Sequence, residues 1–238
     1  MATANTEAAT ETPAETAVAP TYVFLVRHGE NDWVGSNRLA GRTPGVHLNA
    51  KGRDQADKLA DLLQGQPIRA IYSSPMERCM ETAQPLARRL EQIVEPEAGI
   101  VEIDYGAWQG GALKELSATP EWQMVQHYPS QFRFPDGETL HEAQMRAVTT
   151  INRRAQQHAG GAIALFSHGD IIRTSLAHYL GVPLDLFQRI IISTASVSVI
   201  GFFNNRPAVL AVNYLTALPN LEPKPPTTDD QKTSVTHV

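Results

Sequence analysis

Short apolar runs alternate with stretches of helical periodicity along most of the chain. Four runs are too short for buried helices and predict buried strands, at 22–26, 70–74, 93–95 and 162–167. Apolar residues at helical spacing follow most of these runs, and we expect the helices to begin at the cap residue Asn49, at Pro75, at the capping box Thr139–Glu142 and at Asp170. Strands that alternate with helices predict an α/β fold in which helices cover both faces of a mostly parallel sheet.

Three features depart from this alternation. Pro85 lies inside the second expected helix and should kink or split it. The segment 106–137 combines aromatic residues with Pro, Gly and Gln and predicts two short helical pieces. The runs 196–203 and 208–214, separated by NNRP, predict an antiparallel hairpin at a sheet edge, which is a candidate homodimer contact.

The two ends of the chain differ from its body. Residues 1–20 and 221–238 consist mostly of small, polar and proline residues, and they contain too few large apolar side chains to build a core. We therefore expect two disordered tails around a single domain at 21–220.

The charge of the 238-residue chain argues against polyanionic partners. The formal net charge is −5, and most of it lies in the two tails, so the body is nearly neutral. A neutral body gives no electrostatic reason to expect nucleic acid or an anionic membrane as a partner. No apolar run approaches membrane-spanning length, and the first residues lack the pattern of a signal peptide. With a single cysteine, Cys79, no internal disulfide can form, and we expect a cytoplasmic protein.

Charged and polar side chains gather where three predicted strands end. Arg27 and His28 follow the first strand, Arg78 comes one helical turn after the second, and His168 follows the strand at 162–167. Glu102 stands just before the turn YGAWQGG. Each of these residues alone has an ordinary structural explanation. Because the carboxyl ends of neighbouring parallel strands meet at one edge, we expect all five in one pocket.

This set of side chains predicts phosphate-ester chemistry. Two fixed guanidinium groups bind tetrahedral oxyanions, one histidine can act as a nucleophile, and a carboxyl can protonate a leaving oxygen. No G-x-S-x-G or H-E-x-x-H motif and no phosphate-binding loop with lysine is present. Two histidines and Glu102 could hold zinc, but Arg27 and Arg78 would repel the cation. We expect neither a metal ion nor a cofactor.

Five motifs occur in an order that resembles the histidine phosphatase superfamily, with its phosphoglycerate mutase-like fold. They are LVRHGEN, SSPMERCMETA, EIDYGAWQG, PDGET and SHGDIIR, and the resemblance spans residues 21–215. It extends to a bacterial subgroup described as phosphomutases. The resemblance implies a three-layer α/β/α sandwich with a mixed, mostly parallel sheet, a catalytic domain at 21–220 and no metal.

The resemblance also implies roles for individual residues. His28 would be the phosphorylated nucleophile and Glu102 the general acid. Arg27, Arg78 and His168 would hold the phosphoryl oxygens, while Gly29 and Gly169 leave room for the ligand; these positions match the family motifs.

One position departs from the family pattern. Many mutases have an asparagine after the tryptophan of the first motif, where this chain has Val34. Asn31 and Thr43 are candidates to replace its phosphate contact. We therefore favour a phosphomonoester hydrolase that acts on a small phosphorylated metabolite. A phosphoglycerate mutase-type phosphomutase and a catalytically inert phosphate-binding protein remain alternatives, as does a metallohydrolase.

The mechanism requires particular protonation states. His28 must be neutral, with its Nδ1–H donated to an acceptor such as a backbone carbonyl, while His168 is expected to be cationic. Glu102 is expected to be an exposed carboxyl whose pKa rises when the phosphate dianion approaches. We expect the aromatic segment 108–134 to cover the pocket. Arg38 and Arg42 are either solvated or contact a second anionic group of the substrate.

Overall fold

The computed structural model describes residues 19–204 and 206–215. The predicted tails at 1–20 and 221–238 therefore lie outside the described residues, apart from positions 19 and 20. Among the described residues, no helix has both the length and the apolar composition needed to cross a membrane.

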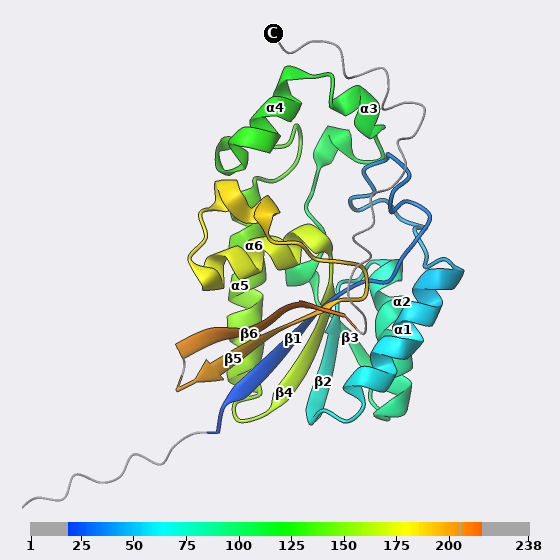
Figure 1. The fold of residues 1–238 in the computed structure, drawn as a ribbon, viewed down its shortest axis with the longest axis vertical. Coiled ribbons are helices and arrows are strands. Elements are labelled where there is room, and N and C mark those ends of the chain that lie inside the picture. The colour runs from blue at the N-terminus through cyan, green and yellow to red at the C-terminus, as the bar shows by residue number, and fades with distance from the viewer. Residues whose placement is uncertain (1–18, 205, 216–238) are drawn as a thin grey trace, which may run out of the picture.

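A six-stranded mixed sheet forms the centre of the structure (Figure 1). Its strands are β1 (Thr21–Arg27), β2 (Ile68–Ser73), β3 (Val94–Pro96), β4 (Ala162–Ser167), β5 (Val197–Phe203) and β6 (Arg206–Tyr214). The spatial order is β3-β2-β4-β1-β5-β6. The first four strands in this order are parallel, whereas β5 and β6 run antiparallel to their neighbours. The predicted α/β fold with a mostly parallel sheet and a hairpin at its edge is confirmed.

Helices cover both faces of this sheet. The longer helices are α1 (Ala50–Leu63), α2 (Glu77–Arg89), α5 (Leu140–Gln157) and α6 (Gly169–Leu180). One face packs against α1 and α2 and the other against α5 and α6, which gives the three layers of the expected sandwich (Figure 1). The central strand β1 contributes to both cores, with Val23 and Leu25 on one side and Phe24 and Val26 on the other. This double burial explains its uninterrupted apolar sequence.

The local start signals of the helices are mostly confirmed. The Asn49 side chain caps α1 by accepting a hydrogen bond from the Gly52 amide, and Thr139 and Glu142 form the full capping box of α5. The prediction that Pro75 opens α2 is wrong, because the helix begins at Glu77 with Met76 as its cap residue. Pro85 lies inside α2, which continues to Arg89, so the proline does not split it.

The aromatic segment extends the core that lies between the sheet and helices α5 and α6. It contains the two expected short helices, α3 (Leu113–Leu116) and α4 (Pro120–His127), and two short 3-10 turns, η2 (Gly106–Trp108) and η3 (Pro129–Gln131). Trp108, Phe132 and Phe134 pack against one another with ring centroids 5.2–5.5 Å apart. These large rings supply the apolar burial that a segment without strands otherwise lacks.

The edge strand β6 leaves one row of apolar side chains exposed. Leu210, Val212 and Tyr214 alternate along the strand and each has 41–54% of its surface accessible. An unpaired edge of this kind is open to pairing or packing with another chain. The homodimer contact at this edge stays a prediction.

A glycine of α1 sets how closely this helix approaches the end of β1. A Cβ at Gly52 would overlap the carbonyl oxygen of Glu30, and a Cβ at Gly29 would lie 2.6 Å from the Gly52 carbonyl oxygen. Two backbones meet here, so no side-chain rotation can relieve a clash. The close packing fixes the loop that begins at His28.

Replacing Gly52 with alanine should therefore destabilise the protein by about 1–3 kcal/mol, although alanine is the better helix former. Denaturant unfolding of Gly52→Ala measures this loss. The matched control is Gly65→Ala, where an added Cβ meets nothing within 4 Å and the expected change is within about 0.5 kcal/mol. Equal stabilities of the two variants would contradict the close approach.

Candidate active site

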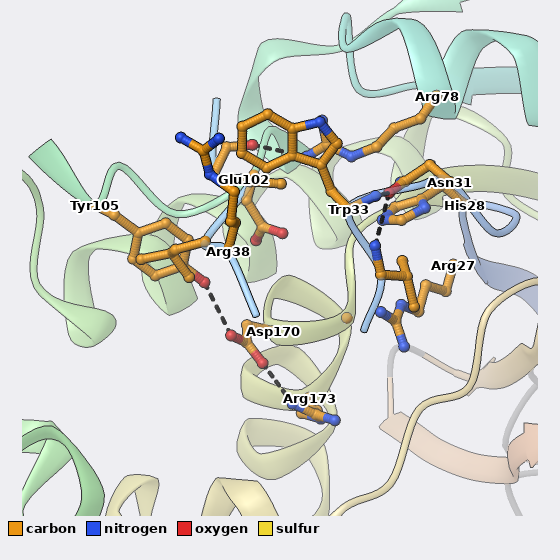
Figure 2. Close-up of a pocket in the computed structure, with 15 residues that line it drawn as sticks. Arg27, His28, Asn31, Trp33, Arg38, Arg78, Glu102, Tyr105, Asp170 and Arg173 are labelled. Atoms are coloured by element: carbon orange, nitrogen blue, oxygen red, sulfur yellow. Dashed lines mark hydrogen bonds and ion pairs between the residues drawn. The ribbon is translucent and has the colours of Figure 1, made fainter. Parts of the chain in front are cut away.

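A pocket opens at the carboxyl ends of β1, β2 and β4, where the topology brings the predicted residues together (Figure 2). Four of the five predicted side chains line it: Arg27, His28, Arg78 and Glu102. The other lining residues are Asn31, Trp33, Val34, Arg38, Leu39, Ala40, Gly41, Tyr105, Gly169, Asp170 and Arg173. Three neighbouring strands and the loop after β1 thus supply one site.

His28 is held as a neutral imidazole. It follows the last residue of β1, and its Nδ1 lies 2.7 Å from the carbonyl oxygen of Gly29. A carbonyl only accepts, so Nδ1 carries the proton and Nε2 keeps its lone pair. Burial, together with the charges of Arg78 and Arg27, holds the pKa of His28 well below its usual range. The expected tautomer and charge of His28 both agree with this geometry.

Arg27 and Arg78 place buried positive charge beside His28. Arg27 is anchored by Nη1 to the Ile192 carbonyl at 2.7 Å, and Arg78 by Nη2 to the Gly41 carbonyl at 2.8 Å. Arg78 is only 1% exposed. The buried Nε of Arg27 and the buried Nε and Nη1 of Arg78 have no hydrogen-bond partner among the described residues. Unpaired buried donors of this kind are suited to an oxyanion.

The acidic residues of α2 that are neighbours of Arg78 in the sequence do not pair with it. The side chains of Glu77 and Glu81 accept hydrogen bonds from the backbone amides of Gly45 and Leu48, in the loop before α1. Neither glutamate forms an ion pair with Arg78 within the described part of the chain, so the guanidinium stays available to the pocket.

His168 lies behind the pocket instead of lining it. It is fully buried, its Nδ1 is 3.0 Å from Nη2 of Arg78, and its Nε2 is 2.7 Å from Oγ of Ser74. A guanidinium only donates, so Nδ1 must accept and the proton sits on Nε2. Burial, Arg78 and His28 also lower the pKa of His168 well below its usual range. The prediction of a cationic His168 is therefore wrong.

Glu102 meets the pocket from the segment that follows the short turn η1 (Ala98–Ile100). Its side chain is 12% exposed, and one carboxyl oxygen accepts the Ile103 amide hydrogen bond at 3.0 Å. Burial, followed by the negative charge of Asp170, raises the pKa of Glu102 to about 7. The expectation of an exposed carboxyl that needs the substrate to raise its pKa is thus wrong, because the fold already does so.

Asp170 is held between Tyr105 and Arg173. The sequence motifs did not lead us to expect either of these two residues in the site. The hydroxyl of Tyr105 donates to Asp170 at 2.9 Å, and Nη1 of Arg173 donates to its other oxygen at 2.7 Å (Figure 2). Asp170 lies in the first turn of α6, after the cap residue His168. The signals were present in the motifs, since Tyr105 belongs to EIDYGAWQG and Arg173 to SHGDIIR.

The two candidates for an extra phosphate contact have different positions. Asn31 lines the pocket, and its Oδ1 accepts hydrogen bonds from the backbone amides of Trp33 and Val34. These bonds fold the loop and leave the amide nitrogen as the group that could contact a ligand. Thr43 is not among the described residues that line the pocket, and the structure does not support it as a contact.

The loop after β1, and not the aromatic segment, forms the outer wall of the pocket. Of the described residues that line the pocket, none comes from 108–134, so the expected cover is wrong. The guanidinium of Arg38 lies over the ring of Trp33 at 4.9 Å and donates to the Gly110 carbonyl. Arg42 points away from the pocket into ion pairs with Asp104 and Glu138.

Gly29 and Gly169 mainly leave space for other parts of the protein, and not for the ligand. Gly29 allows the close approach of Gly52 described above. A Cβ at Gly169 would lie 3.2 Å from Nε of Arg27, so this glycine leaves space for the guanidinium as well as lining the pocket. The prediction that both glycines make room for the ligand therefore needs correction.

The pocket combines side chains that could bind an anion with an imidazole that could act as a nucleophile. Arginine donors and a neutral imidazole surround one space, with a carboxyl of raised pKa beside them. Among the described residues, no group of three or more His, Cys, Asp or Glu side chains is arranged to hold a metal ion.

Known proteins share both the sequence pattern and the fold. The chain is 30% identical to phosphoserine phosphatase 1 of Hydrogenobacter thermophilus over 201 residues, which cover 80% of this chain and 91% of that protein. It is 27% identical over 178 residues to the probable phosphoglycerate mutase GpmB of Salmonella arizonae, covering 74% of this chain and 82% of that protein.

The solved structure of Bacillus stearothermophilus YhfR matches this fold with a TM-score of 0.78 at 25% identity, covering 82% of this chain and 98% of that chain. The sequence profile of the histidine phosphatase superfamily (branch 1) matches residues 23–215, which include every pocket-lining residue. The chain therefore belongs to the histidine phosphatase superfamily and is an enzyme of that superfamily.

Proposed function

We propose that this protein hydrolyses phosphomonoesters of small metabolites through a phosphohistidine on His28, without a metal ion or cofactor. One observation carries the proposal. The Nδ1–H of His28 is held by the Gly29 carbonyl, so the basic Nε2 faces a pocket in which Arg27 and Arg78 have unpaired donors. A nucleophile and an oxyanion clamp thus share one space.

The first step is binding of the phosphate dianion. Its oxygens replace water at the unpaired N–H groups of Arg27 and Arg78, which supply charge-assisted hydrogen bonds. The amide nitrogen of Asn31 adds a neutral contact. His168 keeps Arg78 oriented through the 3.0 Å contact between Nδ1 and Nη2. Because Arg78 is also bonded to the Gly41 carbonyl, little motion is needed when the dianion arrives.

The second step transfers the phosphoryl group to His28. The Nε2 lone pair forms an N–P bond while the ester P–O bond breaks in line. Phosphoryl transfer has a loose transition state in most analyses, so fixed positive charge around the equatorial oxygens supplies most of the acceleration. The lowered pKa of His28 keeps the nucleophile unprotonated despite its buried position.

Glu102 moves the protons in both halves of the reaction. With a pKa of about 7, a large fraction of its carboxyl is protonated at neutral pH and can donate to the departing alkoxide. The resulting carboxylate then takes a proton from water, which attacks phosphorus. This second attack breaks the N–P bond, releases phosphate and restores neutral His28.

Hydrolysis is favoured over mutation by the wall of the pocket. Val34 lines the pocket at the position where many mutases carry an asparagine, so a polar contact to substrate is missing. The relatives support both chemistries, since one is named a phosphoserine phosphatase and another a probable phosphoglycerate mutase. A phosphomutase is therefore the second candidate, and a panel of monoesters with a bisphosphate primer distinguishes the two.

Replacing His28 with alanine should reduce kcat for phosphomonoester hydrolysis by more than about 10³-fold, because the phosphohistidine of the proposed mechanism can no longer form. Steady-state assays measure the loss, and circular dichroism checks that the variant is folded. Near-native turnover by His28→Ala would contradict the nucleophile. Loss of wild-type activity with a chelator would instead favour a metallohydrolase, and phosphate binding without turnover would favour an inert binder.

Replacing Glu102 with glutamine should slow alkyl phosphates by about 10²–10⁴-fold, since their leaving alkoxides need a proton. Hydrolysis of p-nitrophenyl phosphate should fall far less, because p-nitrophenolate leaves without one. The comparison of kcat/KM for the two substrates tests this expectation. An equal loss on both would remove the acid role from Glu102.

The pH profile should report the raised pKa of Glu102. Because the protonated form is the acid, kcat/KM for alkyl phosphates should fall as pH rises through about 7. Asp170 contributes to the raised pKa, so Asp170→Asn should move this basic limb to lower pH. Assays of p-nitrophenyl phosphate over the same pH range serve as the control. An unmoved limb in Asp170→Asn would refute the coupling between the two carboxyls.

A further inference from the structure

The motif PDGET supplies one residue, Glu138, that neither the cap of α5 nor the proposed reaction uses. The motif packs directly against the segment that carries Glu102. The Ala107 amide donates to the Pro135 carbonyl at 2.8 Å, and the Glu138 amide donates to the Asp104 carbonyl at 3.0 Å. A Cβ at Gly106 or Gly137 would overlap the backbone of the opposite segment. The two motifs therefore move as one unit.

The Glu138 carboxylate is the centre of a half-buried ion-pair network. Its side chain is 15% exposed, and Oε1 accepts from Nη2 of Arg146 at 2.6 Å, from Nη2 of Arg42 at 3.1 Å and from the Asp104 amide at 2.8 Å. Its other oxygen accepts from Nε of Arg146 at 3.0 Å. A hub with four hydrogen bonds joins the loop after β1, the segment of Glu102 and helix α5.

The same two arginines hold the backbone of Glu102. Nε of Arg42 donates to the Glu102 carbonyl at 2.8 Å, and Nη2 of Arg146 donates to the same oxygen at 3.0 Å. Arg146 also donates to the Gly99 carbonyl at 3.0 Å. Glu138 thus orients both guanidinium groups, and these groups fix the position of the Glu102 main chain.

The position of the Glu102 carboxyl depends on these bonds to its backbone, because the carboxyl itself forms few hydrogen bonds. Its oxygen accepts only the adjacent Ile103 amide among the described residues, and the nearest His168 nitrogen is 3.6 Å away, which is too far for a hydrogen bond. The direction of the side chain is therefore set by the backbone beneath it. A general acid displaced by about 1 Å can lose about 10²-fold in rate.

We propose that Glu138 is a positioning residue for the general acid: through Arg42 and Arg146 it aims the Glu102 carboxyl at the leaving oxygen. The inference rests on the proposed phosphatase mechanism, in which Glu102 donates a proton. It predicts a selective defect, because Arg27, Arg78 and His28 receive no contact from this network within the described residues. The phosphate clamp should stay intact while proton donation weakens.

The test compares two leaving groups in Glu138→Gln. The amide keeps the size of the side chain but removes its charge and places a donor against Arg146. We expect kcat/KM, which reports the phosphoryl transfer to His28 and not the later hydrolysis, to fall by about 10–100-fold for an alkyl phosphate and to change by less than about threefold for p-nitrophenyl phosphate. The ratio of the two kcat/KM values is the leaving-group readout that a merely structural role would not move.

The chain offers a matched control in Glu97. This buried carboxylate also accepts from two arginines, Arg153 and Arg154, each at 2.7 Å, and from the Gly99 amide, but within the described part of the chain it forms no hydrogen bond with Arg42 or Arg146. Glu97→Gln should lower thermal stability without changing the leaving-group ratio. Arg42→Gln is a second test variant that removes one donor from the Glu102 carbonyl while Glu138 stays in place, and a smaller selective loss is expected.

Hydrogen exchange of the peptide that contains Glu102 gives a readout independent of turnover. Exchange in this peptide should speed up in Glu138→Gln relative to Glu97→Gln at equal global stability. A wild-type leaving-group ratio in both Glu138→Gln and Arg42→Gln, or an equal loss on both substrates, would overturn the inference. Unchanged exchange would do the same. Failure of the phosphatase mechanism itself is seen separately, as activity that survives in His28→Ala.

Discussion

Two guanidinium groups buried beside a neutral imidazole impose the main constraint on this structure. Arg78 is buried and Arg27 is partly buried, and each keeps buried N–H groups that have no hydrogen-bond partner among the described residues. Charge in such a setting is costly unless an anion shares it. Each guanidinium is anchored to a backbone carbonyl, at Ile192 and Gly41, and both arginines line the same pocket. The arginine charges therefore suit the pocket to an anion, whatever reaction follows.

The same burial shifts the pKa values of His28 and Glu102 in opposite directions. Desolvation disfavours the charged form of both side chains, which lowers the pKa of His28 and raises that of Glu102 to about 7. The nearby arginines reinforce the first shift, and Asp170 reinforces the second. A base that stays unprotonated and an acid that stays partly protonated thus coexist near neutral pH. Environment, more than residue type, separates the two roles.

Much of this arrangement could be predicted from the sequence, because its signals are local. Strand ends, cap residues such as Asn49 and the order of motifs depend on neighbouring residues, and they placed Arg27, His28, Arg78 and Glu102 in one pocket. The errors concern groups whose state depends on packing between distant segments. The lowered pKa of His168 follows from its burial and from the charge of Arg78, and both arise only in the folded chain. The exclusion of Thr43 and of 108–134 from the pocket has the same origin.

In the proposed mechanism, the outer wall of the pocket determines which acceptor can reach the phosphohistidine. His28 and the two arginines do not discriminate between water and a second hydroxyl, because both acceptors approach phosphorus along the same line. Trp33, Val34, Arg38 and Leu39 come from a single loop after β1 and stand between the nucleophile and solvent. A substrate that exchanges phosphoryl groups must be retained in two orientations, which demands polar contacts on this wall. The apolar Val34 and the Arg38 guanidinium, already bonded to Gly110 and packed on Trp33, offer few such contacts, which in the proposed mechanism favours water over a bound hydroxyl as the acceptor.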